Sequence, residues 1–333
     1  MPRPSAKRIL SGDVRAAARL MRDLDDEVPS ALRTLRTLYR HTGRAFLLGV
    51  TGPPGAGKST LVDRITSHFR REGKTVGIAA VDPTSPYSGG AILGDRVRMQ
   101  SHALDEGVFI RSLATRGHLG GLSRSTIDVV NVMDAMGKDV VIIETVGVGQ
   151  DEVEIVKVAH TNLVLVVPGL GDDIQALKAG ILEIADIFVV NKSDREGADR
   201  TKQELETMVS MIASPEGGWI PPVVGVVATE GTGVPEVLAE VERHWTFVSR
   251  KENLERYRRE KAKVELLEIL KKRLLEKAVG DLSREGALDR LLGEIARKRL
   301  DPYSVAETVA DHRFSHRPAA ASGARKKAGR GTP

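Results

Sequence analysis

Seven short apolar runs recur along the central part of the chain, and segments with helical periodicity separate most of them. The runs lie near residues 45–51, 75–81, 108–112, 139–144, 162–168, 186–190 and 222–228. Short continuous apolar runs are typical of strands buried on both faces, and their alternation with helices favours parallel strands joined by right-handed crossovers. We therefore predict an α/β domain over residues 45–247, with a mostly parallel central sheet flanked by helices.

Helical patterns without strand signals flank this domain. Apolar pairs such as Ile9-Leu10 and Ala31-Leu32 recur at spacings of three and four, and Ser11-Gly12-Asp13 predicts a helix cap. From residue 248 to about 310 the pattern is helical again. We predict an N-terminal helical extension over residues 1–44 and a C-terminal helical arm over residues 248–312.

The C-terminal arm carries an apolar stripe, formed by Leu266, Leu267, Leu270 and Leu274 among Lys and Glu. Such a stripe either covers the core of its own chain or packs against a second copy. Helices that follow a completed sheet have little core left to cover, so we favour a dimer contact and expect a homodimer.

Composition narrows the class of protein. The chain has 333 residues and 41% hydrophobic residues, which is enough for a substantial core. Cysteine is absent, which excludes disulfides and thiol chemistry and agrees with a reducing cytoplasm. No apolar run is long enough to span a membrane, so we expect a cytoplasmic protein without a membrane partner.

The net charge of +5 is concentrated at the C-terminus. Residues 316–333 hold five basic residues and no acidic one, so the rest of the chain is near neutral. This segment is rich in Ala, Gly, Pro and Ser, and we predict a disordered basic tail over residues 313–333. Because the body is near neutral, the charge gives no argument for a nucleic-acid partner.

A phosphate-binding pattern follows the first apolar run. Residues 52–59 fit G-x-x-x-x-G-K-[ST], between a predicted strand and a predicted helix. A glycine-rich turn in that position directs backbone N–H groups and a helix N-terminus at one anion. Lys58 would reach the β- and γ-phosphates, and the Ser59 hydroxyl would coordinate Mg²⁺. The predicted phosphate-binding residues are Gly52, Pro53, Pro54, Gly55, Ala56, Gly57, Lys58, Ser59 and Thr60.

A second motif selects the base. Asn191-Lys192-Ser193-Asp194 follows an apolar run, and ligands bind at the carboxyl ends of strands in open α/β sheets. The Asp194 carboxylate can accept two hydrogen bonds from guanine but none from the same edge of adenine, which favours GTP over ATP. Lys192 would lie along the base, and Asn191 would tie loops together. Val227, Ala228 and Thr229 follow the last run, and their amides are candidates for guanine contacts.

Carboxylates after two further runs are candidate partners of Mg²⁺. Asp82 and Glu144 end apolar runs, and Asp95 lies in the loop after Asp82. Mg²⁺ prefers oxygen ligands and keeps several waters, so these residues would complete a site with Ser59. Gly147 is placed to direct its N–H at a γ-phosphate.

No glutamine follows Gly147 directly, where one would orient the attacking water in a Ras-like enzyme. Lys178 or Arg98 would then supply positive charge to the transition state, and Gln150 is displaced from the usual position. We expect slow turnover by the isolated protein and acceleration by a partner. The loop 167–178, with two glycines and several charges, is a candidate mobile switch.

Taken together, these motifs resemble those of the MeaB/ArgK-type P-loop GTPases, the chaperones of adenosylcobalamin-dependent methylmalonyl-CoA mutase. The matching segments lie in order at 52–60, 81–86, 89–96, 114–121, 144–150, 168–175, 191–194 and 300–303. The chain departs from the family at Val227-Ala228-Thr229, where Ser-Ala-x is usual.

This resemblance implies a GTPase domain with helical extensions and a homodimer held partly by the C-terminal arm. It implies GTP hydrolysis that gates the loading of adenosylcobalamin onto an acyl-CoA mutase and protects or reactivates that enzyme. GTP, GDP and Mg²⁺ are the implied ligands. The implied Mg²⁺ and switch positions are Ser59, Asp82, Asp95 and Glu144, with a mobile switch over residues 167–178.

Four alternatives remain open. A metal-insertion GTPase would need Cys/His clusters, whereas the chain has no Cys and eight scattered His. A protein-targeting GTPase would need a methionine-rich module, and seven Met show no clustering. A kinase acting on an amino-acid-binding transport protein would need a separate protein-substrate site, for which the sequence has no signal. The fourth is a nucleotide-gated binding module with negligible turnover.

Overall fold

The computed structural model describes residues 5–82, 100–102, 104–114, 124–145, 158–169, 184–211, 218–284 and 286–314. The chain forms two compact units, Met1–Glu265 and Leu266–Pro333. The first unit holds the sheet and the predicted nucleotide motifs.

The described residues of the first unit form a seven-stranded sheet with the order β3-β2-β4-β1-β5-β6-β7. Every pair of neighbouring strands is parallel. The strands are β1 (Phe46–Thr51), β2 (Val76–Asp82), β3 (Val108–Ala114), β4 (Val140–Glu144), β5 (Thr161–Val166), β6 (Ile187–Asn191) and β7 (Val223–Val226). Each strand lies where the sequence places an apolar run, so the predicted fold class is confirmed.

The helices follow in chain order. They are α1 (Ala6–Leu10), α2 (Val14–Asp25), α3 (Pro29–Tyr39), α4 (Lys58–Arg71), the 3₁₀ helix η1 (Gln100–His102), α6 (Arg124–Ala135), α9 (Ala198–Met211), α10 (Val234–Val248), α11 (Lys251–Arg284), α12 (Ala287–Ala296) and α13 (Pro302–Phe314). At the start of α2, the carboxylate of Asp13 accepts a hydrogen bond from the Ala16 amide at 2.8 Å. The cap predicted from Ser11-Gly12-Asp13 is therefore present.

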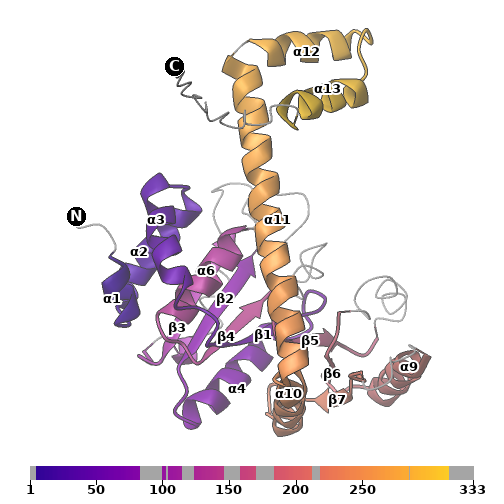
Figure 1. Ribbon diagram of the computed structural model, residues 1–333. Coiled ribbons are helices and arrows are strands. Elements are labelled where there is room, and N and C mark those ends of the chain that lie inside the picture. The colour runs from indigo at the N-terminus through magenta and orange to yellow at the C-terminus, as the bar shows by residue number, and fades with distance from the viewer. Residues whose placement is uncertain are drawn as a thin grey trace, which may run out of the picture. The chain divides into compact units, whose positions relative to one another are not determined.

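Helices cover both faces of the sheet (Figure 1). On one face, alternate strand residues such as Val140 and Ile142 pack with the apolar residues of α4 and α10. On the other face, Val141 and Ile143 pack with α2, α3 and α6, and α9 covers β5 and β6. Since neighbouring residues of a strand point to opposite faces, strands buried on both sides must be apolar throughout. This is why the strands read as continuous apolar runs.

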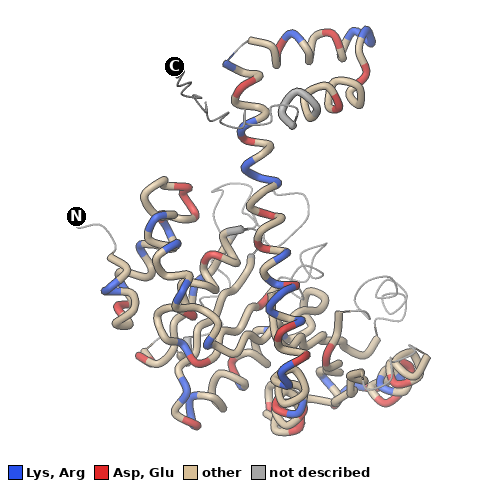
Figure 2. Tube along the Cα trace, in the orientation of Figure 1, with Lys and Arg blue, Asp and Glu red and all other residues tan. Residues whose placement is uncertain are grey.

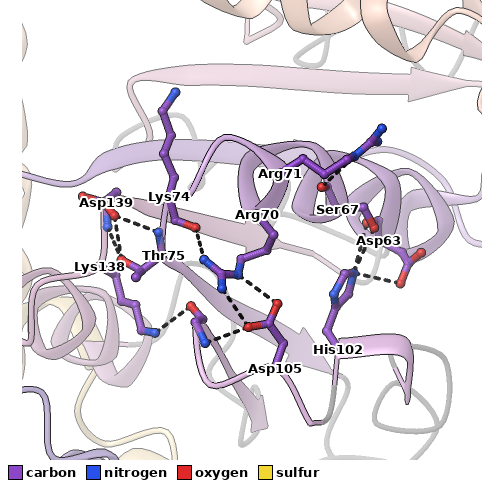
Figure 3. A network of polar contacts seen from close by, with 11 residues as sticks. Asp63, Ser67, Arg70, Arg71, Lys74, Thr75, His102, Asp105, Lys138 and Asp139 are labelled. Atoms are coloured by element: carbon purple, nitrogen blue, oxygen red, sulfur yellow. Dashed lines mark hydrogen bonds and ion pairs between the residues drawn. The ribbon is translucent and has the colours of Figure 1, made fainter.

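The amino-terminal edge of the sheet is fastened by side chains that bind backbone groups at the strand starts. The Asp139 carboxylate accepts the Thr75 amide at 2.7 Å, ahead of β2. The guanidinium of Arg70 holds both oxygens of Asp105 at 2.9 Å, and Asp105 accepts the amide of Gly107 ahead of β3 (Figure 3). A Cβ at Gly107 would collide with that guanidinium, so a larger residue there would displace the Arg70 side chain from Asp105.

An aromatic cluster at the same edge surrounds two histidines. His160 Nδ1 accepts the Leu47 amide at 2.9 Å, and its ring packs against Trp245 and Tyr257. Burial lowers the pKa of His160 to about 3, with Lys261 and Arg258 adding to the effect. Burial also lowers the pKa of His244 to about 4. Both rings are therefore neutral at physiological pH.

The second unit consists of the rest of α11 with α12 and α13. Charges of both signs are distributed along α11 (Figure 2), and exposed pairs such as Lys271–Glu268 add little stability. Large apolar side chains of this unit are exposed, among them Leu266, Leu270 and Leu274. Among the helices in the described ranges, none combines the length and the apolar character that a membrane crossing requires.

We expect the free energy of unfolding to fall as the pH is lowered from about 6.5 toward 4. In that interval unfolded histidines gain protons that folded His160 and His244 do not accept. Asp186 acts in the opposite direction, because its raised pKa of about 7 favours the folded state at low pH. Because two histidines act against one carboxylate, the net free energy of unfolding should still fall as the pH is lowered.

His160→Asn tests this assignment, since an amide oxygen can replace Nδ1 as the acceptor but does not titrate. The variant should flatten the pH dependence by up to about 1.4 kcal/mol per pH unit in urea unfolding experiments. His41→Asn, outside the aromatic cluster, controls for the general effect of replacing a histidine. Equal slopes for His160→Asn and the unmodified protein would contradict the assignment.

Candidate functional site

The predicted nucleotide motifs meet at the carboxyl edge of the sheet. Thr51, Glu144 and Asn191 are the last residues of β1, β4 and β6. The sheet order places β4 beside β1, with β5 between β1 and β6. Because all of these strands are parallel, their carboxyl ends share one edge, where α/β proteins bind their ligands.

The glycine-rich loop between β1 and α4 is held by hydrogen bonds from Lys58 to its own backbone. Gly57 caps α4 in the left-handed conformation with φ 88°, which glycine adopts readily. Lys58 is 6% exposed, and its ammonium donates to the carbonyl oxygens of Gly52 at 2.7 Å and Pro53 at 3.0 Å. A positive charge therefore lies at the N-terminus of α4, where the free N–H groups of the first turn also attract anions.

Ser59 and Glu144 lie together beside this loop. The Ser59 hydroxyl donates to Glu144 Oε1 at 2.6 Å, and both side chains are buried. Next to them, the hydroxyls of Thr51 and Thr145 are 2.8 Å apart. The structure thus brings together two of the residues predicted for Mg²⁺, and hydroxyl and carboxylate oxygens are ligands that suit this ion.

Within the described ranges, no group of three or more His, Asp or Glu side chains is arranged to hold a metal ion alone. In nucleotide sites Mg²⁺ is usually bound through one or two protein oxygens, water and substrate phosphates. Ser59 and Glu144 fit that smaller protein contribution.

Asn191 connects the glycine-rich loop to the loop after β7. Its Nδ2 donates to the Ala56 carbonyl at 2.7 Å, and its Oδ1 accepts the Ala228 amide at 3.1 Å. The side chain is 3% exposed and fills the space beside Gly57, where a Cβ would collide with Nδ2. The link between loops that the sequence predicts for Asn191 is therefore present.

The rest of the second motif forms a turn at the surface. Lys192 has φ 59°, and its ammonium donates to the Gly55 carbonyl at 2.8 Å, which adds a second link to the glycine-rich loop. Ser193 exchanges hydrogen bonds with Val226, at 3.0 Å in both directions. Asp194 follows in the turn and is exposed.

Sequence reasoning missed two contributors to this site. Arg64, in the second turn of α4, donates to the carbonyls of Ala228 and Thr229 and fastens the loop after β7 to the helix. The pair of Thr51 and Thr145 joins the ends of two neighbouring strands. Neither belongs to a recognisable motif, and only the spatial approach of distant segments makes them partners.

Several predicted residues cannot be placed. Asp95, Gly147 and Lys178 lie outside the described residues, as do Arg98 and Gln150. Asp82 is the last residue of β2, and its side chain lies outside the description. Of the predicted switch over residues 167–178, only 167–169 are described.

Gly52→Ala should destabilise the fold by about 2–4 kcal/mol and weaken guanine-nucleotide binding at least about tenfold. A Cβ at Gly52 would collide with the backbone carbonyl of Leu165 in β5, and φ is 139°. Chemical denaturation and calorimetry with GDP measure the two effects.

Gly73→Ala is the matched control for this variant. Gly73 also has a positive φ, of 78°, but a Cβ there would meet no atom within 4 Å. It should cost about 1 kcal/mol and leave nucleotide binding unchanged. If the two substitutions changed stability and nucleotide binding equally, the close approach of Gly52 to β5 would not explain the effects of Gly52→Ala.

Comparison with known proteins places this site in a family. The family model "Methylmalonyl Co-A mutase-associated GTPase MeaB" matches residues 17–283. A putative GTPase of Pyrococcus abyssi is 47% identical over 305 residues, covering 91% of this chain and 94% of the relative. GTPase ArgK of Escherichia coli is 34% identical over 293 residues, covering 86% and 87%.

A solved structure shares the fold. The protein described as LAO/AO transport system kinase superimposes with a TM-score of 0.69 at 23% identity, covering 93% of this chain and 96% of that one. A phosphate-binding loop, a guanine-type Asn-Lys-x-Asp turn and a matching family model over most of the chain agree with one another. The chain belongs to the MeaB family of methylmalonyl-CoA mutase-associated GTPases.

Proposed function

We propose that this GTPase is a chaperone that gates the loading of adenosylcobalamin onto an acyl-CoA mutase of the methylmalonyl-CoA mutase type, and that it protects or reactivates that enzyme. The family match over residues 17–283 supports the proposal, since the family is described by its association with methylmalonyl-CoA mutase. The link from Asn191 to Ala56 carries the nucleotide part, because it fixes a base-binding turn to a phosphate-binding loop.

In this proposal the nucleotide spans the carboxyl edge of the sheet. Residues 52–60 bind the phosphates, with Lys58 released from Gly52 and Pro53 to reach the β- and γ-phosphates. Asp194 accepts two hydrogen bonds from guanine, and Lys192 lies along the base. The amide of Ala228 already donates to Asn191, so a direct guanine contact from the loop after β7 would come from Thr229.

Ser59 and Glu144 would hold Mg²⁺, with Asp82 and Asp95 as further candidates. The hydrogen bond of 2.6 Å between Ser59 and Glu144 supports this role, because it aligns two oxygen donors beside the phosphate-binding loop. The ion would neutralise charge that develops on the phosphates during hydrolysis. Gly147 and Lys178 are proposed to sense and stabilise the γ-phosphate.

Communication with a mutase requires that GTP and GDP favour different states of the protein. A coupling of this kind is typically about 1–3 kcal/mol. We place its origin at Gly147 and at the loop 167–178. We also propose a cytoplasmic homodimer, in which the exposed stripe of Leu266, Leu267, Leu270 and Leu274 contributes to the contact.

Three other functions are weaker alternatives. The kinase alternative is supported only by the description of the structural relative as a transport system kinase. The sequence identity of 23% to that protein supports a shared fold but not a shared activity. A metal-insertion GTPase needs a metal-loading cluster, and the chain has no cysteine. A nucleotide-gated binding module would bind GTP without turnover.

Asp194→Asn should weaken GDP binding at least about a hundredfold and improve binding of xanthosine diphosphate. The variant loses two charge-assisted hydrogen bonds to guanine, while its amide can donate to the 2-oxo group of xanthine. Calorimetry with both nucleotides measures the change. Asp199→Asn, at the exposed start of α9, is the control and should leave both affinities unchanged. Unaltered GDP binding by Asp194→Asn would contradict the assignment of the base site.

Hydrolysis of GTP should be slow for the protein alone and at least about tenfold faster with an adenosylcobalamin-dependent acyl-CoA mutase from the same host. Single-turnover assays with and without the purified mutase measure this ratio. Lys58→Ala should remove both rates, which excludes a contaminating GTPase. Equal rates with and without the mutase would contradict the chaperone proposal, and radiolabel transferred from GTP to an amino-acid-binding protein would favour the kinase.

A further inference from the structure

A cavity of about 580 Å³ lies at the amino-terminal edge of the sheet, opposite the nucleotide edge. It opens between the starts of β5 and β6, the segment before β7, the end of α10 and the beginning of α11. The lining residues used below are Asn162, Asp186, Trp219, His244, Phe247, Arg256 and Glu260. All belong to the first unit, and the volume is typical of sites for small ligands.

Asp186 is the unusual group of this cavity. Its carboxylate accepts the amide of Asn162 at 2.7 Å and Nδ2 of the same residue at 3.0 Å, and lies 3.3 Å from His244 Nε2. The side chain keeps 26% exposure. In the described part of the chain, no Lys or Arg forms an ion pair with it. Burial raises the pKa of Asp186 to about 7.

A carboxylate that accepts the backbone N–H at the start of a strand does not need to lack an ion pair or to have a raised pKa. Asp139 performs the same task at the start of β2, where it accepts the amide and the hydroxyl of Thr75. Those hydrogen bonds lower the pKa of Asp139, and the charges of Lys138 and Lys74 add to the effect. Asp186 binds the backbone of β5 without an ion pair to Lys or Arg in the described ranges, which is costly for a carboxylate that is only 26% exposed.

His244 does not supply the missing positive charge. Burial lowers its pKa to about 4, and its Nδ1 lies 2.9 Å from the Thr161 hydroxyl. The ring is neutral at physiological pH. Arg256 and Glu260 line the cavity one helical turn apart on α11, and both are exposed, so their opposite charges nearly cancel at the rim. When it is ionised, Asp186 gives the floor of the cavity a negative charge that attracts a cation.

Aromatic side chains form the walls of the cavity, and their contacts hold the rings in fixed orientations. Trp219 Nε1 donates to the backbone oxygen of Asp186 at 2.7 Å, and its ring packs against His244 and Phe247. Guanidinium groups already lie over two of these rings, with Arg243 at 5.3 Å from Trp219 and Arg250 at 5.4 Å from Phe247. These contacts indicate that the rings accept cations on their faces.

Asn162 adds a second, independent sign of a ligand. The residue is 2% exposed, and within the described ranges its Oδ1 has no hydrogen-bond partner. An unsatisfied buried acceptor is unfavourable, so a ligand with several N–H groups would recover this loss after a small rotation of the amide.

We propose that this cavity binds an organic cation, a primary ammonium or guanidinium group on a short apolar stem, with the charged group at Asp186 and the stem along Trp219 and Phe247. The cation neutralises the buried carboxylate, and its remaining N–H groups reach Asn162. The same chemistry is found in a free amine and in a Lys or Arg side chain of a partner protein.

The two sites are separate but share a strand. Asp186 directly precedes β6 and Asn191 ends it, so the five residues of β6 connect the cavity to the nucleotide edge. The strand spans about 17 Å, which excludes direct contact between the two ligands. Binding of GDP therefore reports on the integrity of the fold without reporting on the cavity.

Tryptophan fluorescence of the full chain is a direct readout. The chain contains two Trp, of which Trp219 lines the cavity and Trp245 packs against His160 with ring centroids 4.9 Å apart. We expect benzylamine to change the emission in a saturable way and to bind at least tenfold more tightly than benzyl alcohol, its neutral counterpart. Titrations at constant ionic strength remove general salt effects.

Asp186→Asn keeps the shape of the side chain and should weaken benzylamine binding at least tenfold, with GDP affinity unchanged. Asp199→Asn is the matched control and should behave as the unmodified protein. A further titration compares capped arginine and lysine (the N-acetyl methylamides) with benzylamine and putrescine. Tighter binding of the capped amino acids would indicate that the cavity binds a side chain of a partner protein. Tighter binding of benzylamine and putrescine would indicate that it binds a free amine.

Equal binding of benzylamine and benzyl alcohol overturns the proposal, as does the absence of a saturable signal with every cation. Unchanged benzylamine affinity in a folded Asp186→Asn variant overturns it as well. If that variant does not fold, the comparison of amine and alcohol on the unmodified protein decides the question.

Discussion

The paired hydrogen bonds of Asn191 hold the nucleotide edge together. One buried amide satisfies the Ala56 carbonyl of the phosphate-binding loop and the Ala228 amide of the loop after β7. Both loops carry polar backbone groups that need partners away from water, and a single side chain provides them. Gly57 must lack a side chain for this amide to fit. The spacing between the phosphate-binding loop and the base-binding turn thus depends on contacts inside the protein.

The two edges of the parallel sheet have opposite chemistry. At the carboxyl edge, the N-terminus of helix α4 and the ammonium group of Lys58 attract phosphate. At the amino edge, the first N–H groups of the strands need acceptors, and the carboxylates of Asp139 and Asp186 supply them. Phosphates of a ligand therefore suit the carboxyl edge, whereas at the amino edge these two carboxylates bind backbone N–H groups of the protein itself. Asp186 differs from Asp139 because aromatic side chains lie around it and, among the described residues, no Lys or Arg forms an ion pair with it.

Much of the fold follows from local pattern. The seven apolar runs predicted all seven strands, because strands covered on both faces must be apolar at every position. The glycine-rich motif predicted its own turn, since Gly57 takes a left-handed conformation that few other residues tolerate. The link made by Asn191 was also predicted, from its place at a strand end. The partnership of Ser59 with Glu144 combines residues that are 85 positions apart, and the motif context alone suggested it.

By itself, the sequence determined the strand positions, the parallel sheet, the phosphate-binding loop and the family, because these depend on periodicity and on short motifs whose residues are neighbours in the chain. Only the tertiary structure decided that Arg64 binds the loop after β7, that Thr51 meets Thr145, and that Asp186 lies in an aromatic cavity where no described Lys or Arg pairs with it. Burial and side-chain pairing involve segments that are distant in the chain. A shifted pKa or a cavity therefore arises only after those segments have packed together.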